Sequence, residues 1–541
     1  MRRFGTAVLH AFRAVGGAAR RAAPGAVVGM VTAAAAVAVG ELAAVLTGPR
    51  TAPAIAVGSA AIDLTPTPLK EFAIRNFGTN DKLVLLIGIY TTLAVIAVVA
   101  GVLALRRLAY GLVLVALFGL VGAWAALSRP TGSFQDVWPS VLAALAGAAV
   151  MTLMAASARA AGMAAPSSRA QDVGPGPVDA FLPPWARDRR GFLTLAAGTA
   201  GAAAVTGLAG RVAVDKRYDV TLKRSRVRIP APAVPAPPLP AGVHPDVAGL
   251  SGFITANPDF YRVDTALVLP QVDPDAWRLR IRGMVDHPLE LTFADLLARP
   301  LIEHDQTLSC VSNEVGGSLV GTARWIGASL ADLLREAGVR RGADQLVGRS
   351  VDGMTIGAPV ESVLDGRTGL LAVAMNGEPL PVAHGFPCRM LIPGFYGYVS
   401  ATKWLVDLEL TTFADYDAYW VRRGWARLGP VKTASRIDVP RPFARVAAGT
   451  VTVAGVAWAT HRGVDAVEIR ADGGPWRPAG LAASDGPDTW RQWTGDLTLA
   501  AGPHRIEVRA TDGTGAVQTE QRTDTFPSGS TGWHSVVITV V

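Results

Sequence analysis

The stretch EHDQTLSCVSNEVGGSLVGTARWIGASL, residues 303–330, decides how the second half of the chain is interpreted. It begins with the end of an apolar, strand-like run, and Cys310 stands where that run stops. A polar, glycine-rich turn follows over Ser312 to Gly317, and Leu330 to Ala337 has the pattern of a helix. Thiolate is the softest common protein ligand, so a cysteine that ends a strand beside a polar loop is a candidate ligand for a soft metal.

Cys310 has two other interpretations. Single cysteines are most often small buried hydrophobic residues. Cys388 is the only other cysteine, and a disulfide between the two is the third interpretation, because the topology predicted below places them in an oxidising compartment. Residue chemistry alone leaves all three open. Two cysteines are too few for a disulfide scaffold, a CxxC…CxxC zinc site or a cysteine-ligated iron–sulfur cluster.

Several motifs, in a fixed order, carry a resemblance to a known family. They are Cys310-Val-Ser-Asn313, Trp325-Ile-Gly327, Asn376-Gly-Glu-Pro-Leu-Pro381, His384-Gly-Phe-Pro-Cys-Arg389, and Pro393-Gly-Phe-Tyr-Gly397 followed by Lys403-Trp404. Together they resemble the sulfite oxidase family of molybdenum enzymes, from about Ala241 to the C-terminus. The resemblance implies an α+β molybdopterin domain in which Cys310 ligates molybdenum that a molybdopterin dithiolene also holds.

The resemblance also implies which residues line the cofactor, an anionic pterin that carries a phosphate. The planar fork of Arg389 and the compact charge of Lys403 suit a phosphate. The implied catalytic residues are Cys310 and Arg262, and the implied metal ligand is Cys310. The implied cofactor-binding residues are Asn257, Phe260, Tyr261, Arg262, Cys310, Asn313, Ser350, Asp352, His384, Arg389, Ser400, Thr402 and Lys403. Taken singly, each has a plainer interpretation as a loop, surface or strand-end residue.

The sequence departs from the animal and plant sulfite oxidase pattern directly after the cysteine. Paired arginines for a substrate anion are expected there, but Glu314 and Val315 occupy these positions. An anion buried without cationic partners is costly. If Glu314 faces the metal, it therefore favours a neutral S- or N-oxide over sulfite, and if it pairs with an arginine such as Arg324, the argument fails. Sulfite dehydrogenase stays the alternative function.

The first two hundred residues lie outside the resemblance and are apolar. The chain has 541 residues, half of them hydrophobic, and a mean hydropathy of +0.32, which is high for a soluble protein. Apolar runs at about 26–46, 83–105, 108–128, 138–157 and 192–210 are each long enough to cross roughly 30 Å of hydrocarbon as a helix. They predict a membrane domain over residues 1–212 with about five transmembrane helices.

The positions of the arginines predict the orientation of these helices. Positively charged loops stay in the cytoplasm, and arginines cluster in residues 1–25, at Arg106-Arg107 and over Arg159 to Arg190. An odd number of spans then places the catalytic region on the extracytoplasmic face of the cell membrane. Asp188-Arg189-Arg190-Gly-Phe192-Leu193 also resembles a twin-arginine export signal. Plain positive-inside charge is the alternative, and both interpretations give the same topology.

Three further regions follow the membrane domain. Residues 213–243 are basic and then proline-rich, which predicts an extended linker. Residues 244–412 contain short strands and few long helices, which predicts an α+β catalytic domain. From residue 413, alternating strands such as Val451 to Trp458 and His504 to Ala510 lie between glycine-rich turns, which predicts an immunoglobulin-like β-sandwich. A sandwich in this position mediates dimerisation in the resembled family, so a homodimer is expected.

The sequence also predicts cofactors and partners. No histidine lies in a predicted span, no CxxCH motif occurs, and no cytochrome b5-like module is recognisable, so we expect molybdenum-molybdopterin without haem or an iron–sulfur cluster. Electrons would pass to a separate cytochrome or membrane redox protein. The net charge of +8 is concentrated beside apolar runs, which does not favour nucleic-acid binding. A cofactor-free membrane receptor that binds through the β-sandwich is the alternative of another class.

Overall fold

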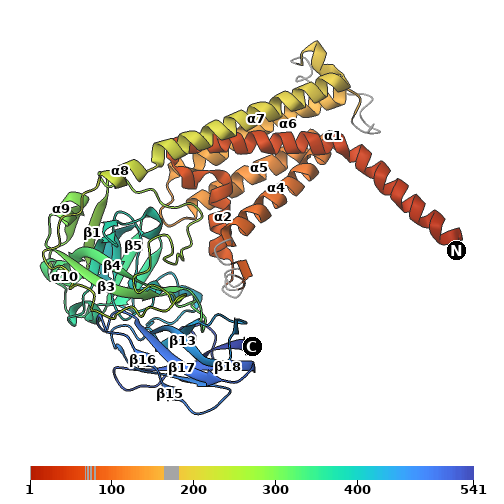
Figure 1. The fold of residues 1–541 in the computed structure, drawn as a ribbon. Coiled ribbons are helices and arrows are strands. Elements are labelled where there is room, and N and C mark those ends of the chain that lie inside the picture. Colours follow the sequence, from red (N-terminus) through yellow and green to blue (C-terminus); the bar gives the residue numbers. More distant parts are fainter. Residues whose placement is uncertain (1, 67–68, 70–71, 73–75, 78–80, 164–181) are drawn as a thin grey trace. The chain divides into compact units, whose positions relative to one another are not determined.

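The computed structural model describes the chain except for residues 1, 67–68, 70–71, 73–75, 78–80 and 164–181. The chain divides into two compact units (Figure 1). The first comprises Met1–Asp219 and Thr265–Val268, and the second comprises Val220–Asp264 and Leu269–Val541. Parts of the arginine-rich segment from Arg159 to Arg190, on which the predicted orientation depends, lie outside the described residues.

The first unit is a bundle of apolar helices. They are α1 (Arg2–Thr47), α2 (Pro53–Leu64), α4 (Asp81–Arg106), α5 (Leu108–Leu127), α6 (Trp138–Ala160) and α7 (Arg189–Tyr218). Helix α1 packs along α4, α6 and α7 (Figure 1). Within the described residues, five stretches are long and apolar enough to cross a membrane, namely Ala22–Thr47, Lys82–Arg106, Leu108–Leu127, Phe134–Ala160 and Arg189–Arg226. These stretches contain the apolar runs predicted as spans, apart from a residue at one end.

Glycines explain why α1 and α4 approach each other closely. A Cβ atom added at Gly29 would collide with the carbonyl group of Ala97, and one added at Gly101 would collide with the backbone of Gly25 and Gly29. Small residues let the backbones of membrane helices come into contact, which gains van der Waals packing where no hydrophobic effect acts between helices. The glycine positions therefore set the pairing of α1 with α4.

The first residues of the segment predicted as a linker are helical. Helix α7 begins where the Asp188 carboxylate accepts a hydrogen bond from the Gly191 amide (2.6 Å), and it continues to Tyr218. A short helix, α8 (Thr221–Arg226), follows. The proline-rich part then lies along the catalytic region, where Val234 forms a parallel bridge with Ile302. The proline-rich part has no helix and pairs with Leu301 and Glu303 through the backbone of Val234, and the assignment of residues 213–243 as a linker stays a prediction.

Two sheets form the catalytic part of the second unit. One has the strand order β2 (Leu289–Thr292), β1 (Arg278–Gly283), β10 (Leu405–Thr411), β5 (Gln345–Ser350) and β6 (Thr355–Pro359), with β1 parallel to β10. The other has the order β3 (Leu301–Ser309), β4 (Val320–Ser329), β7 (Leu370–Met375) and β8 (Glu378–Pro379), and β9 (Arg389–Leu391) also pairs with β7. The connecting helices are α9 (Phe293–Leu297), α10 (Leu330–Ala337), α11 (Glu361–Leu364) and α12 (Gly397–Ser400).

Side chains from both sheets meet in one buried core. Leu346 and Leu408 of the first sheet belong to the same cluster as Leu371 of the second. Helix α10 covers this core with its apolar face, and its cap is local: the Ser329 hydroxyl accepts a hydrogen bond from the Asp332 amide (3.2 Å). The helix predicted over Leu330 to Ala337 is confirmed.

The C-terminal residues form two facing sheets. The first contains β11 (Ala434–Val439), β13 (Gly449–Trp458), β17 (Arg491–Leu499) and β16 (Gly480–Leu481), and the second contains β12 (Arg445–Val446), β19 (His534–Val540), β18 (Gly502–Asp512), β14 (Val464–Ala471) and β15 (Arg477–Pro478). Trp493 of the first sheet is buried in the same cluster as Val508 and Ile538 of the second. Strands β13 and β18 cover the two strands predicted there.

The C-terminal sheets border the loop that follows Cys310. Val311 and Tyr396 of the catalytic part are buried together with Trp458 and Trp490 of the C-terminal part. The Ser530 hydroxyl donates a hydrogen bond to the Asn313 carbonyl group (2.7 Å). The C-terminal sheets therefore help to shape the surroundings of the predicted metal ligand.

Candidate functional site

Cys310 lies directly after β3, in the loop that joins β3 to β4. Its amide donates to the Leu319 carbonyl group (2.9 Å), and the Asn313 side-chain oxygen accepts from the Leu319 amide (2.8 Å), so the loop is held at both ends. Cys310 and Cys388 are both free and buried. The disulfide interpretation is therefore wrong, and Cys388 is instead part of the hydrophobic core.

The surroundings of Cys310 suit a thiolate that a cation stabilises. Burial raises the pKa of the Cys310 thiol, although hydrogen bonds from Ser312 and the positive charge of Lys403 act in the opposite direction. A coordinating metal ion removes the proton of a thiol outright. The site thus holds a protonated cysteine that is ready to become a metal ligand.

Two tyrosines lie close enough to Cys310 for its charge to act on their hydroxyl groups. Burial, and then the charge of Cys310, raises the pKa of Tyr396 to about 12. The same two causes raise the pKa of Tyr261, whose ring stacks on Phe260 at 5.3 Å between centroids. Both hydroxyls stay neutral, so each can donate a hydrogen bond to an anion beside the thiol. Tyr396 was absent from the predicted set, although it lies in the motif Pro393 to Gly397.

Three cations and one carboxylate gather next to this group. The Lys403 ammonium and the Arg262 guanidinium share Asp264, each with a nitrogen 2.8 Å from Oδ2. Arg389 is 7% exposed, and its guanidinium lies over the Trp325 ring at 5.4 Å from the centroid. Its Nη1 donates to the His384 carbonyl group (3.3 Å). One carboxylate cannot neutralise three cations, so the cluster carries excess positive charge.

Burial is the main cause of the lowered pKa values in the cluster. It lowers the pKa of Arg389 to about 10. Burial, together with the charge of Arg389 and against the attraction of Asp264, lowers the pKa of Lys403 to about 8. Burial and then Arg389 lower the pKa of His384 to about 4, so His384 is neutral at pH 7. Its Nε2 lies 3.1 Å from the Asn257 carbonyl group. A cluster with these properties is stabilised by an anion.

Unpartnered polar atoms test whether molybdopterin fits here. Ser350 Oγ, Thr402 Oγ1 and Arg389 Nε are buried and have no hydrogen-bond partner within the described part of the chain. Buried polar atoms normally have partners, and all three residues belong to the predicted cofactor-binding set. A phosphorylated pterin offers both the negative charge and the hydrogen-bonding groups that these residues lack. The residues fit molybdopterin, with Cys310 available for the metal.

Other predicted residues use their side chains to build the site. The Asn257 side chain bonds Asn376 (2.9 Å) and Glu378 (2.5 Å), and Phe260 packs edge-on against Trp325 and His384. Asp352 accepts from the Met354 amide (3.1 Å), and Ser400 donates to the Phe395 carbonyl group (3.1 Å). Asn313, as described above, holds the Cys310 loop. These five side chains support neighbouring groups in the site.

Arg262 forms an ion pair with Asp264, and its predicted catalytic role stays a prediction. Its ion pair with Asp264 places it in the cationic cluster, and its charge contributes to the lowered pKa values of Lys403 and His384. Arg262 is thereby connected to the cofactor end of the site through Asp264. The sequence held a weak signal for this pairing, because the two residues are close neighbours in the chain.

Glu314 lines a small polar pocket beside the Cys310 loop. The pocket has a volume of about 20 Å³, and its other lining side chains are uncharged, including Ser309, Tyr396 and Gln518. Arg324, the alternative partner of Glu314, instead binds Asp305 with distances of 2.9 and 2.6 Å. Glu314 is exposed. Among the described residues, the one charged side chain in the lining of this pocket is therefore the Glu314 carboxylate.

The burial of Lys403 predicts a pH-dependent stability for the cofactor-free protein. Its folded pKa of about 8 lies below its ordinary value of 10.5, so the unfolded chain binds more protons between these pH values, and the stability contributed by Lys403 rises with pH there. The rise is roughly 3 kcal/mol. In urea unfolding followed by tryptophan fluorescence, Lys403→Met should exceed the wild type in stability at pH 7.5, and the difference should shrink by pH 10. A difference independent of pH would contradict the burial of a charged lysine.

Comparisons with known proteins agree with this chemistry. A sequence model of the oxidoreductase molybdopterin binding domain matches residues 266–420. Mitochondrial sulfite oxidase of Macaca fascicularis is 32% identical over 308 residues, which cover 47% of this chain and 55% of that protein. Sulfite oxidase of Gallus gallus is 30% identical over 52% of this chain and 72% of that protein. The uncharacterized oxidoreductase YuiH of Bacillus subtilis (strain 168) is 36% identical over 29% of this chain and 76% of that protein.

A solved structure is also similar to part of the chain. It is the sulfane dehydrogenase SoxCD from Paracoccus pantotrophus, with a TM-score of 0.47 and 24% identity over 54% of this chain and 84% of that one. The chain spans little more than half the length of the macaque sulfite oxidase.

Proposed function

Because this chain belongs to the sulfite oxidase family of molybdopterin-dependent oxidoreductases, we propose that it is a membrane-anchored enzyme that moves an oxygen atom to or from a small substrate. The molybdenum cofactor, when bound, supplies the oxygen-atom transfer and the electron storage. Family membership excludes the cofactor-free receptor. The observation that carries the proposal is the buried cationic cluster with unpartnered donors beside the free Cys310.

In this proposal the protein's own residues bind the cofactor, hold the metal, bind substrate and orient one another. Arg389 and Lys403 bind the cofactor phosphate, and their burial strengthens the attraction because little water screens it. The hydroxyl groups of Ser350 and Thr402, which have no hydrogen-bond partner in the described chain, would form hydrogen bonds with the cofactor. Cys310 holds the metal, and the neutral hydroxyl of Tyr396 donates a hydrogen bond to substrate beside it. Asp264 orients Lys403 through its ion pair.

We further propose that the preferred substrate is a neutral S- or N-oxide. The polar pocket beside the Cys310 loop contains Glu314 and no cationic lining side chain. Arg436, which reaches this loop by donating to the Gly317 carbonyl group (2.9 Å), is neutralised by Asp438 (2.6 Å). The Glu314 carboxylate adds a formal negative charge to this lining, which costs more for a sulfite dianion than for a neutral oxide.

The substrate proposal predicts that Glu314→Gln changes the rate with sulfite but not the rate with sulfoxides. Sulfite oxidation with ferricyanide should increase about tenfold in kcat/KM, because a nearby unit charge is removed, while reduction of sulfoxides with reduced viologen should stay unchanged. Glu290→Gln, which removes an exposed carboxylate on β2, is the matched control and should change neither rate. Efficient sulfite oxidation that is unchanged in Glu314→Gln would show that this pocket does not select the substrate.

Sulfite oxidation is the second candidate function. It is favoured by the sulfite oxidases of Macaca fascicularis and Gallus gallus, which are 32% and 30% identical to the matched parts of this chain. In that case Arg436 or another arginine would have to exchange partners when substrate binds. The assays above separate the two candidates, because they compare sulfite with neutral oxides on the same protein.

For the membrane arrangement, we propose that residues 1–212 anchor the enzyme and that the catalytic domain faces away from the cytoplasm. The arginine positions support this orientation. Alkaline phosphatase fused after residue 245 should be active in cells, and a fusion near residue 170 should be inactive, because the reporter folds only outside the cytoplasm. The reverse pattern would place the active site in the cytoplasm.

Two partners complete the proposal. We propose that a separate cytochrome or membrane redox protein accepts the electrons, since no haem or iron–sulfur motif was recognised in the sequence. We also propose that residues 413–541 form an immunoglobulin-like sandwich that dimerises the enzyme. The two facing sheets around Trp493 support the sandwich arrangement. Molecular mass measured by light scattering in detergent, with and without residues 413–541, tests the dimer.

A further inference from the structure

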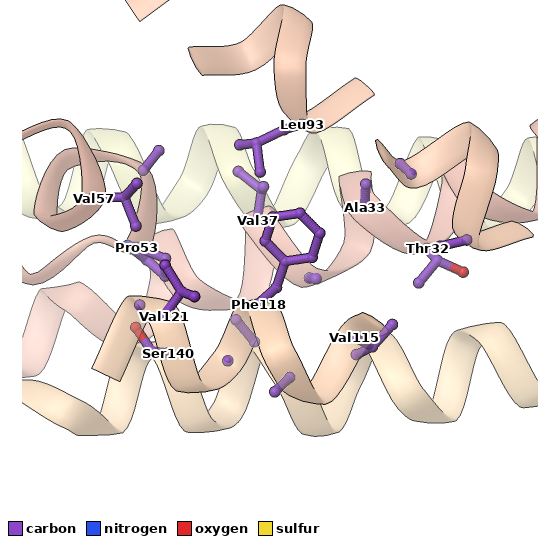
Figure 2. A pocket seen from close by; sticks show the side chains of 18 of the residues that line it. Thr32, Ala33, Val37, Pro53, Val57, Leu93, Val115, Phe118, Val121 and Ser140 are labelled. Carbon is purple, nitrogen blue, oxygen red and sulfur yellow. The ribbon is translucent and has the colours of Figure 1, made fainter. Parts of the chain in front are cut away.

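Charged side chains are distributed unevenly in the helical unit. Figure 2 shows a cavity of about 160 Å³ between α1, α2, α4, α5 and α6, and its described lining, which includes Val37, Leu93 and Phe118, contains no charged side chain. Arginines instead gather at one end of the helices, where α4 ends, α5 begins, α6 ends and α7 begins. Positive charge beside a membrane span orients it. The arrangement of these arginines in the fold indicates a second role.

The ends of α4 and α6 lie against each other at this level. Arg159, in the last turn of α6, donates from Nη2 to the Ala104 carbonyl group in the last turn of α4 (2.8 Å). Ala104 also belongs to the same buried cluster as Ala158 of α6 and Phe192 of α7. Helix α4 ends at Arg106, and Arg107 precedes α5 directly. Arg106, Arg107 and Arg159 are thereby brought to one small region of the surface.

Few carboxylates offset the positive charge at this end. The exposed arginines there are Arg106, Arg107, Arg159, Arg187, Arg189 and Arg190. On the described parts of the same helix ends the one carboxylate is that of Asp188, which already accepts a hydrogen bond from the Gly191 amide (2.6 Å). The opposite end of α7 differs, because Lys216 and Arg217 lie between Asp215 and Asp219. The excess of positive charge is therefore a property of one end of the helices.

The surface of α5 next to these arginines changes in a regular order. Tyr110 follows Arg107 by one turn and is 49% exposed, and the Arg107 guanidinium lies 5.9 Å from the centroid of its ring. Val113, one turn further, is 63% exposed, and Leu117 is also exposed. Exposed tyrosines are typical of the headgroup level of a membrane. A cation, an aromatic ring and then apolar side chains match the headgroup, the interface and the acyl chains of a lipid.

We propose that the adjoining ends of α4, α5 and α6 bind the headgroup of an anionic phospholipid, whose phosphate oxygens accept hydrogen bonds from Arg106, Arg107 and Arg159. The planar guanidinium fork suits a phosphate, and Arg159 keeps further N–H groups after its bond to Ala104. Basic pockets between transmembrane helices bind anionic headgroups in the cytoplasmic leaflet. The inference rests on the proposed membrane arrangement, which places this end in that leaflet, and it is independent of the substrate.

The test uses the full chain in a non-ionic detergent, with bound lipids counted by native mass spectrometry. Phosphatidylglycerol should bind at least about tenfold more tightly than phosphatidylcholine with the same acyl chains. Arg106→Gln combined with Arg107→Gln should weaken phosphatidylglycerol binding about fivefold for each arginine removed and leave phosphatidylcholine binding unchanged. Both side chains are exposed, so folding should persist.

Two controls accompany this variant. Lys216→Gln combined with Arg217→Gln removes the same charge from the opposite end of α7 and should leave both affinities unchanged. Glycerol 3-phosphate, which carries the phosphate without acyl chains, should not displace phosphatidylglycerol at equal concentration. Arg189 and Arg190 are left in place, because they belong to the segment that resembles an export signal.

Three outcomes would overturn the proposal. Equal affinity of the wild type for the two lipids would show that no headgroup is selected. An equal loss in the Lys216, Arg217 control would show general attraction between opposite charges, and displacement by glycerol 3-phosphate would identify a site for a soluble phosphate. Recovery of the chain in the soluble fraction without detergent would contradict the membrane arrangement as well, whereas the first three outcomes in membrane-bound protein contradict this inference alone.

Discussion

Replacing Cys310 by serine should abolish the Mo(V) signal of the enzyme and reduce turnover by more than about a hundredfold. Even mutation of a residue that only hydrogen-bonds to a metal ligand lowers metal affinity or activity about 10–100-fold. Serine offers a harder oxygen with a much higher pKa, so it cannot replace a thiolate that molybdenum holds. Cys310 has no partner cysteine, and its loop is held by backbone bonds to Leu319, so the fold should persist. Electron paramagnetic resonance, turnover and the amount of protein in the membrane fraction measure these effects.

Cys388→Ala is the matched control for this experiment. Cys388 is 0% exposed and packs in the core shared by the two catalytic sheets. Alanine leaves a small cavity there, at a cost of about 1 kcal/mol, and should retain the Mo(V) signal and most of the turnover. Serine is a poorer control, because it would bury a hydroxyl group among apolar side chains. Retained activity in Cys310→Ser would show that Cys310 is not the metal ligand.

Replacing Arg389 by methionine should change cofactor content and stability in opposite directions. The molybdenum content should fall below about a tenth of an equivalent, because the buried cation that attracts the phosphate is lost. The cofactor-free protein should become more stable by about 1–4 kcal/mol, because a buried charge without an anionic partner is replaced by an apolar side chain of similar volume. The cation is 7% exposed, and burial lowers its pKa to about 10.

Two measurements are needed for this prediction. Metal analysis and pterin fluorescence give the cofactor content, and urea unfolding of protein made without molybdopterin synthesis gives the stability. Arg335→Gln, on the exposed face of α10 with 59% of its side chain accessible, is the control and should change neither quantity. Full cofactor content in Arg389→Met would contradict the assignment of the phosphate site. Loss of both cofactor and stability would show that Arg389 acts as a structural residue.

The sequence by itself determined the elements that depend on local pattern. The apolar runs identify the five helices in the described part of the chain that are long and apolar enough to cross a membrane, because length and composition are local properties. The helix from Leu330 to Ala337 follows from its cap at Ser329 and its amphipathic spacing. The position of Cys310 directly after a strand is also local. Order and spacing of the motifs then identified the family.

The tertiary structure decided which distant residues share an environment. Asp264 and Lys403 meet although they are far apart in the chain, and their contact makes Arg262 part of the cationic cluster. Tyr396 is buried with Val311, the residue after Cys310, in a cluster that also contains Trp458 and Trp490 of the C-terminal sheets.

The sequence pattern likewise did not determine how residues 213–243 and the apolar helices of the first unit pack. The proline-rich segment folds onto Ile302 because an exposed strand edge offers backbone partners there. Val37 and Phe118 line one cavity because glycine and alanine contacts set how the helices pack. A linear pattern specifies which faces are apolar, but many pairings of such faces satisfy it. Only packing, close backbone approach and the pairing of buried charges select one of them.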